Sequence, residues 1–202
     1  MRVKKTQYII GIDEAGRGPL AGPVSVAAVA TMSRLSLDNR LRDSKKLSEK
    51  KREQWFKWLK QKQKSGQLKF TVSLVGEKII DRIGIVLAIR IGIKRCLSRL
   101  TLNPKQYQIL LDGSLYAPKI YRKQKTIIRG DEQVPIIMLA SIAAKVRRDQ
   151  RMCKLALIHP DYGFEIHKGY GTRSHYVALR RRGLSPLHRR SFLKNFQATF
   201  NK

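Results

Sequence analysis

Acidic residues are scarce in this chain. Only 14 of its 202 residues are Asp or Glu, against 43 Lys or Arg, which gives a formal net charge of +29. Solubility alone needs far less charge, so the excess predicts a polyanionic partner, with nucleic acid as the leading candidate. A membrane surface is the alternative, but it calls for a basic amphipathic helix or a lipidation motif, and neither stands out. We therefore expect a phosphate-rich partner and no membrane.

Cysteine and long apolar runs are also scarce. Cys96 and Cys153 are the only cysteines and form no C-x-x-C pair, so neither a zinc site nor a disulfide framework is expected. No run approaches the roughly 18 apolar residues of a membrane span. Asp13 and Glu14 interrupt the apolar region behind the basic N-terminus, so no signal peptide is expected. Hydrophobic residues still make up 42% of the chain, which predicts one globular domain. The two free thiols and the lack of a signal peptide predict a cytoplasmic protein, and we expect a monomer.

The hydrophobic pattern predicts an α/β chain. Runs of β-branched and small apolar residues favour strands, whereas apolar residues at helical spacing favour helices. The expected strands cover residues 8–12, 24–31, 68–75, 107–111 and 126–128, and the expected helices cover 49–64, 77–100 and 136–158. The short loop between the first two strands predicts an antiparallel hairpin. Gly84 and Gly92, inside the second helix, are expected to mark a break or a close packing point.

Carboxylates follow three of the expected strands. Asp13 and Glu14 come directly after the first strand, Asp112 after the fourth, and Asp131 after a glycine behind the fifth. Ligands gather at the carboxyl ends of strands in open α/β sheets, and adjacent carboxylates repel unless a cation lies between them. The four acids therefore predict a site for two Mg²⁺ or Mn²⁺ ions, about 3.5–4 Å apart, that clamps a phosphodiester. The alternative is that each acid is simply a turn residue.

A glycine-rich loop follows the first acidic pair, with Gly16, Gly18 and Gly22 around Arg17. Glycines let a backbone approach a ligand closely. A dinucleotide-binding fingerprint needs G-x-G-x-x-G and then a helix, whereas here the third glycine comes one residue too late and a strand follows. The P-loop pattern also fails, because no G-K-[ST] occurs. A tight hairpin loop beside an accidental acidic pair is the alternative, which we rank below a metal site.

The segment from residue 159 onward mixes aromatic and basic side chains, a composition typical of nucleotide stacking and phosphate contact. For Tyr162, Phe164 and Tyr176 we nevertheless favour core packing, as we do for Trp55 and Trp58. The four histidines of the chain lack metal-ligand spacing.

Five motifs occur in order along nearly the whole chain: residues 12–24 (IDEAGRGPLAGPV), 43–48 (DSKKLS), 140–149 (ASIAAKVRRD), 167–172 (HKGYGT) and 188–192 (HRRSF). Between the second and third lie Asp112, after a leucine and before a glycine, and Asp131, after a glycine. This ordered set resembles the motifs of ribonuclease HII, the type 2 ribonucleases H. The first motif alone is specific. One departure is Gly84, where the family usually carries asparagine.

The resemblance implies an α/β, RNase H-like fold: a mixed five-stranded sheet flanked by helices, with a helical C-terminal extension. Residues 1–172 would form the catalytic domain and residues 173–202 the extension. The implied enzyme cuts the RNA strand of RNA–DNA hybrids and cuts 5′ of ribonucleotides embedded in duplex DNA, leaving 3′-hydroxyl and 5′-phosphate ends. These activities would serve primer removal and ribonucleotide excision.

The resemblance also implies roles for single residues. Two Mg²⁺ or Mn²⁺ ions would be held by Asp13, Glu14, Asp112 and Asp131. The 2′-hydroxyl would be read by Gly16, Arg17 and Gly18, largely through backbone groups, and that hydroxyl is what separates RNA from DNA. Tyr170 would pack on the neighbouring sugar, and Lys45 or Lys46 would contact the scissile phosphate region.

A non-catalytic, basic nucleic-acid-binding protein is the alternative function. Such a binder gains nothing from carboxylates facing a phosphate backbone, which they repel, so the four acids favour the nuclease. The related ribonuclease HIII carries an extra N-terminal domain, and we expect the type 2 enzyme because the first strand already begins at Tyr8. A sliding-clamp contact through residues 196–200 (FQATF) stays open.

Overall fold

The computed structural model describes residues 8–32, 47–103 and 107–194, and its sheet is the mixed five-stranded one expected. The strands are β1 (Tyr8–Ala15), β2 (Val24–Thr31), β3 (Lys69–Val75), β4 (Tyr107–Asp112) and β5 (Gln124–Ile127), in the order β3-β2-β1-β4-β5. β2 pairs antiparallel with β1 and β3, which confirms the predicted hairpin, while β1, β4 and β5 run parallel.

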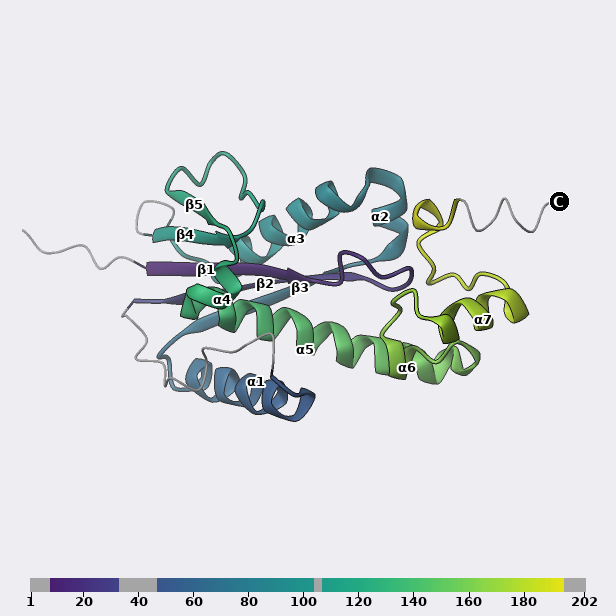
Figure 1. Cartoon of the computed structure of the whole chain (residues 1–202). Coiled ribbons are helices and arrows are strands. Elements are labelled where there is room, and N and C mark those ends of the chain that lie inside the picture. Colours follow the sequence, from purple (N-terminus) through teal and green to yellow (C-terminus); the bar gives the residue numbers. More distant parts are fainter. Residues whose placement is uncertain (1–7, 33–46, 104–106, 195–202) are drawn as a thin grey trace, which may run out of the picture.

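Helices lie on both faces of this sheet (Figure 1). They are α1 (Glu49–Lys64), α2 (Glu77–Ile83), α3 (Ile85–Leu100), α4 (Gly130–Gln133), α5 (Pro135–Ile158), α6 (Phe164–His167) and α7 (Arg173–Arg182). Two 3₁₀ turns, Pro160–Tyr162 and Arg190–Phe192, lie in the C-terminal region. Ser48 caps α1 as expected, because its Oγ accepts a hydrogen bond from the Lys51 N–H at 3.3 Å.

The two glycines of the expected second helix have different structural roles. Gly84 separates α2 from α3 with φ of +81° and ψ of 159°, a conformation that is essentially restricted to glycine. An asparagine, which the resemblance led us to expect here, would be strained in this backbone. Gly92 is a close packing point, because a Cβ there would lie 2.6 Å from Val26 Cγ2 of β2.

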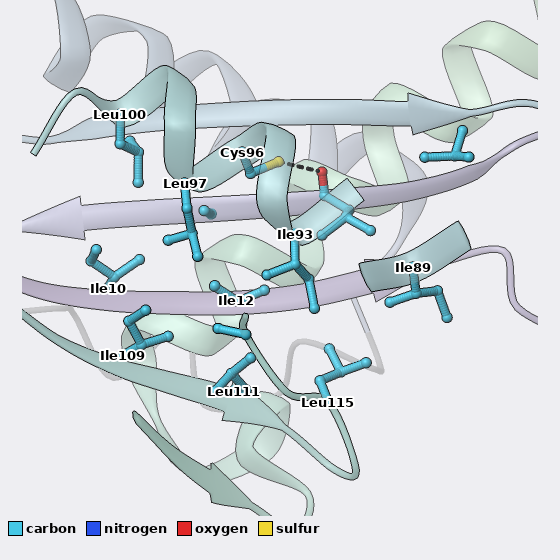
Figure 2. Close-up of a cluster of buried hydrophobic side chains, with 14 of the residues drawn as sticks. Ile10, Ile12, Ile89, Ile93, Cys96, Leu97, Leu100, Ile109, Leu111 and Leu115 are labelled. Atoms are coloured by element: carbon cyan, nitrogen blue, oxygen red, sulfur yellow. Dashed lines mark hydrogen bonds between the residues drawn. The ribbon is translucent and has the colours of Figure 1, made fainter. Parts of the chain in front are cut away.

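Side chains of alternate residues in β1 point to opposite faces of the sheet. Ile10 and Ile12 pack under α3 together with Ile93, as Figure 2 shows, and Cys96 Sγ donates a hydrogen bond to the Val26 carbonyl at 3.3 Å. Gly11 faces the other side, where a Cβ would lie 2.4 Å from the backbone carbonyl of Ile136. The missing side chain therefore lets α5 lie directly on β1. Trp55 and Trp58 pack beside α5 in this second core, as predicted.

A third apolar cluster joins the glycine-rich loop to the C-terminal region. Leu20 and Ala21 of the loop pack with Met152 of α5, Phe164 of α6 and Leu179 of α7. The predicted core roles of the aromatic residues in this region are confirmed: Tyr162 and Phe164 are buried, and Tyr176 packs at the edge of the cluster. The cluster takes residues from both sides of the proposed boundary at residue 172, and that division stays a prediction.

Candidate active site

One hollow of about 460 Å³ brings together the four acids singled out in the sequence. It is lined by Asp13, Glu14, Ala15, Gly16, Arg17, Gly18, Arg52, Asp112, Asp131, Ser141, Ile142, Lys145 and Tyr170. The parallel pairing of β1 with β4 aligns Ile12 with Leu111, so the next residue on each strand is an acid of the set. The fourth acid comes from α4, where the Asp131 N–H donates to Asp112 Oδ1 at 3.1 Å.

Two expectations about the acids need correction. Asp13 and Glu14 do not follow β1 but lie within it, because β1 continues its pairing with β2 to Ala15 after its pairing with β4 has stopped at Ile12. Asp131 does not lie at the end of β5 either, since that strand ends at Ile127 and α4 carries the acid. The acids converge because β1 protrudes beyond β4 and a short helix folds back over the strand ends.

Burial and mutual repulsion make the acidic pair costly without a counterion. Burial, then the charges of Glu14 and Asp112, raise the pKa of Asp13 well above its usual range, although hydrogen bonds from Ser141 and the Glu14 N–H oppose the shift. Burial also raises the pKa of Glu14. A divalent cation would favour the ionised forms, and carboxylate oxygens are the ligands that Mg²⁺ and Mn²⁺ prefer. The chemistry of the donor set therefore fits such ions.

The present side-chain positions are not those of an assembled metal centre. No group of three His, Cys, Asp or Glu side chains that could hold one ion occurs among the described residues. Glu14 Oε1 instead lies 3.5 Å from Arg17 Nη1, in an ion pair at the mouth of the hollow. Ion binding would therefore require at least some of these carboxylates to turn toward the metal.

The glycine-rich loop forms one wall of the hollow. Gly16 adopts φ of +91°, and a Cβ there would lie 1.9 Å from Arg148 Nε, so both conformation and space require glycine. A Cβ on Gly18 would meet no atom within 4 Å, so the space beside it is open to a ligand. The Arg17 side chain is half exposed.

Tyr170 also lines the hollow, with its side chain partly exposed. Lys145 Nζ and the Arg148 guanidinium lie 5.7 and 5.6 Å from the ring centroid. The Tyr170 carbonyl accepts a hydrogen bond from His175 Nδ1 at 2.8 Å, which anchors the turn that carries the ring. The loop, Tyr170 and the four acids thus line the same hollow, whereas Lys45 and Lys46 fall outside the described residues.

Sequence reasoning missed three polar residues that line the hollow: Arg52, Ser141 and Lys145. Ser141 and Lys145 lie one helical turn apart on α5, on the face that also carries Arg148, so the α-helical spacing of residues 141, 145 and 148 was the available signal. No sequence pattern singled out Arg52 of α1. Lys145 Nζ lies 3.0 Å from Asp149 Oδ1.

Comparison with known proteins assigns the family. The family model for ribonuclease HII matches residues 10–195. The chain belongs to the ribonuclease HII family. A ribonuclease HII of Coxiella burnetii is 43% identical over 184 residues, covering 91% of this chain and 87% of that protein. A ribonuclease HII of Ruminiclostridium cellulolyticum is 45% identical over 189 residues, covering 94% of this chain and 71% of that protein.

Solved structures give the same family and fold. Ribonuclease HII in the PCNA complex from Archaeoglobus fulgidus superposes with a TM-score of 0.69 at 26% identity, covering 90% of this chain and 93% of that chain. Ribonuclease HIII of Bst, crystallised with Mn²⁺, shares only the fold, with a TM-score of 0.59 at 15% identity over 88% of this chain and 63% of that chain. The expected RNase H-like fold is confirmed.

Membership of the family settles the broad activity. As a member of this family, the chain is an endonuclease with ribonuclease H activity on RNA–DNA hybrids, and the family generally uses divalent metal ions. None of the helices among the described residues is long and apolar enough to cross a membrane. The cytoplasmic location and the monomeric state stay predictions.

Proposed function

We propose that this enzyme cuts the RNA strand of hybrids and also cuts 5′ of single ribonucleotides embedded in duplex DNA, leaving 3′-hydroxyl and 5′-phosphate ends. The observation that carries the proposal is the convergence of four acids, the glycine-rich loop and Tyr170 in one hollow. In that arrangement a single nucleotide step would meet the metal ligands, the backbone of the glycine-rich loop and the aromatic ring of Tyr170. Primer removal and ribonucleotide excision are the cellular tasks that such a cut would serve.

Asp13, Glu14, Asp112 and Asp131 would hold two Mg²⁺ or Mn²⁺ ions. When bound, such ions would activate a water for in-line attack and stabilise the charge on the leaving 3′-oxygen. The carboxylates fix where the scissile phosphate must lie, and the excess of basic side chains holds the flanking phosphates. Lys45 or Lys46 would contact the phosphate region.

Ribonucleotide recognition would fall to the two walls of the hollow. Backbone groups of Gly16, Arg17 and Gly18 would hydrogen-bond the 2′-hydroxyl, which only RNA offers. The Tyr170 ring would pack on the neighbouring sugar, where a second 2′-hydroxyl is not required. A single ribonucleotide in a DNA strand would then satisfy both walls.

Cleavage of a labelled DNA duplex with one ribonucleotide tests the proposal. Wild type, Asp13→Asn and the control Asp161→Asn, an exposed acid paired with Arg182, would be assayed in Mg²⁺, in Mn²⁺ and with chelator. We expect metal-dependent cutting 5′ of the ribonucleotide by wild type and control, and none by Asp13→Asn, although that variant still binds the duplex. Tight, salt-sensitive binding without cutting in either metal would instead indicate a basic nucleic-acid-binding protein.

A further inference from the structure

Two arginine side chains are fully buried beside the hollow. Arg148 of α5 and Arg189, which precedes the second 3₁₀ turn, are both 0% exposed. Within the described part of the chain, neither forms a salt bridge. Burying a charge is costly unless hydrogen bonds compensate for lost water, so the partners of these two guanidinium groups need an explanation.

Both guanidinium groups donate to backbone carbonyls of the glycine-rich loop. Arg189 donates through Nε, Nη1 and Nη2 to the carbonyls of Gly22, Arg17 and Gly16, at 2.9, 3.0 and 2.7 Å. Arg148 donates through Nε and Nη2 to the carbonyls of Pro23 and Ala21, at 3.0 and 3.2 Å. Five of the eight carbonyls of residues 16–23 thus point at the two side chains, which we call the arginine clamp.

The clamp sets the direction of the N–H groups as well. In a planar trans peptide the C=O and the N–H of the next residue point to opposite sides. Holding the carbonyls of Gly16 and Arg17 inward therefore turns the N–H groups of Arg17 and Gly18 away from the clamp. Among the described residues, neither N–H has a hydrogen-bond acceptor, and both residues line the hollow.

Arg148 also connects the loop to the aromatic wall. Its guanidinium lies 5.6 Å from the centroid of the Tyr170 ring, and its Nε occupies the space that a side chain on Gly16 would need. Burial, then the charge on Arg148, lower the pKa of Arg189 to about 9, which still leaves it charged at neutral pH. Two positive charges thus lie behind the backbone wall.

We propose that Arg148 and Arg189 are positioning residues for ribose recognition: they hold the loop so that the N–H groups of Arg17 and Gly18 face the 2′-hydroxyl. The inference rests on the proposed role of this loop. It adds residues far along the chain, and outside contact with substrate, to the determinants of ribonucleotide specificity.

Asp81 of α2 locks the segment that supplies Arg189. Its carboxylate accepts hydrogen bonds from the Arg190 N–H and the Ser191 N–H, both at 2.9 Å, and from Ser191 Oγ at 2.6 Å. Asp81 lies on the surface and does not line the hollow. Its removal is therefore a mild way to loosen the clamp without emptying a buried site.

The test compares Arg189→Lys, Arg148→Lys and Asp81→Ala with two controls. Lysine keeps the charge but has a single nitrogen, so it cannot donate in the fork geometry of arginine. Ile93→Ala, which truncates a buried side chain of α3, controls for lost stability. Arg99 donates a hydrogen bond to the Val72 carbonyl, away from the hollow. Arg99→Lys therefore controls for the general effect of losing an arginine that bonds to a backbone carbonyl.

Two quantities are measured for each variant. The first is kcat and KM on an RNA–DNA hybrid and on the single-ribonucleotide duplex. The second is the ratio of affinities for the single-ribonucleotide duplex and an all-DNA duplex of the same sequence, measured with chelator. We expect the lysine variants to lose about 10²-fold in kcat, the usual effect of a misplaced substrate, and their affinity ratio to fall toward one. Affinity for all-DNA duplex should not change, because phosphate contacts dominate it.

Three outcomes decide the inference. Folded lysine variants that keep both the wild-type kcat and the wild-type affinity ratio would overturn it, as would an equal fall of the ratio in Ile93→Ala. If the lysine variants do not fold, Asp81→Ala decides, and an unchanged ratio there overturns the inference. If wild type cuts hybrids but not the single-ribonucleotide duplex, the proposed function fails in that part, and the hybrid kinetics still test the clamp.

Discussion

Two buried histidines, His175 and His188, form a neutral hydrogen-bonded relay behind Tyr170, and acid should break it. His175 Nδ1 donates to the Tyr170 carbonyl, so the neutral ring leaves its Nε2 as an acceptor. His188 Nδ1 accepts from the Ser185 N–H at 2.9 Å, so His188 Nε2 carries the proton that joins the two rings at 3.0 Å. His167 stacks on His175 with ring centroids 4.3 Å apart. A further proton on either linked ring would place two N–H groups face to face.

The expected loss of stability follows from the pKa values. Burial lowers the pKa of His175 from 6.5 to about 4, and burial with the neighbouring His175 does the same to His188. The unfolded chain therefore binds more protons than the folded one between pH 6.5 and about 4, so stability falls as pH falls through this window. A shift of this size corresponds to about 3 kcal/mol for the first histidine protonated, a large part of the ~5–15 kcal/mol of a typical domain.

Urea unfolding from pH 7 to pH 4 measures this loss. Asp13 and Glu14 have raised pKa values, so they contribute stability to the fold as pH falls over part of the same range. The informative quantity is therefore the difference in pH dependence between variants. His175→Phe keeps a ring but cannot titrate, and should flatten the pH dependence, whereas His159→Gln, outside the relay, should not. Equal pH dependence in wild type and His175→Phe would refute the neutral relay.

Two further predictions concern the scaffold. Gly92→Ala should lower the free energy of unfolding by about 1–2 kcal/mol, because overpacking against Val26 outweighs the gain in helix propensity; adding Val26→Ala should relieve the clash, which a double-mutant cycle of unfolding free energies would detect. Ser48→Ala should cost about 1 kcal/mol through loss of the N-cap of α1. Full stability in urea unfolding would show that α1 does not depend on this cap.

Much of the fold was predictable because local signals agreed with the tertiary structure. The strands of the sheet, the cap at Ser48 and the break at Gly84 follow from β-branched runs, capping chemistry and glycine conformation. The ends of β1 and β5 were misjudged, because strand ends depend on pairing with other strands. β1 extends through Asp13 and Glu14 only because β2 continues beside it.

The candidate site was predictable as a set of acids but not as an assembly. Residue types and strand ends indicated which carboxylates converge, whereas the arginine clamp joins residues more than 120 positions apart in sequence. The histidines illustrate the same limit. Their spacing excluded a metal site, but only the folded chain brings His167, His175 and His188 together.

The distribution of charge predicts that metal and nucleic acid bind cooperatively. The net charge of +29 attracts a nucleic-acid duplex, but the four acids in the hollow repel the phosphates nearest to them. Metal ions on those acids would reverse the repulsion, so at constant ionic strength Mg²⁺ should strengthen binding of an all-DNA duplex, which offers no ribonucleotide to cut. In a variant with Asp13→Asn and Asp112→Asn the repulsion is reduced and Mg²⁺ only competes for phosphates, so it should weaken binding. Fluorescence anisotropy titrations measure both affinities. The same weakening in wild type would mean that the acids do not couple metal to nucleic acid.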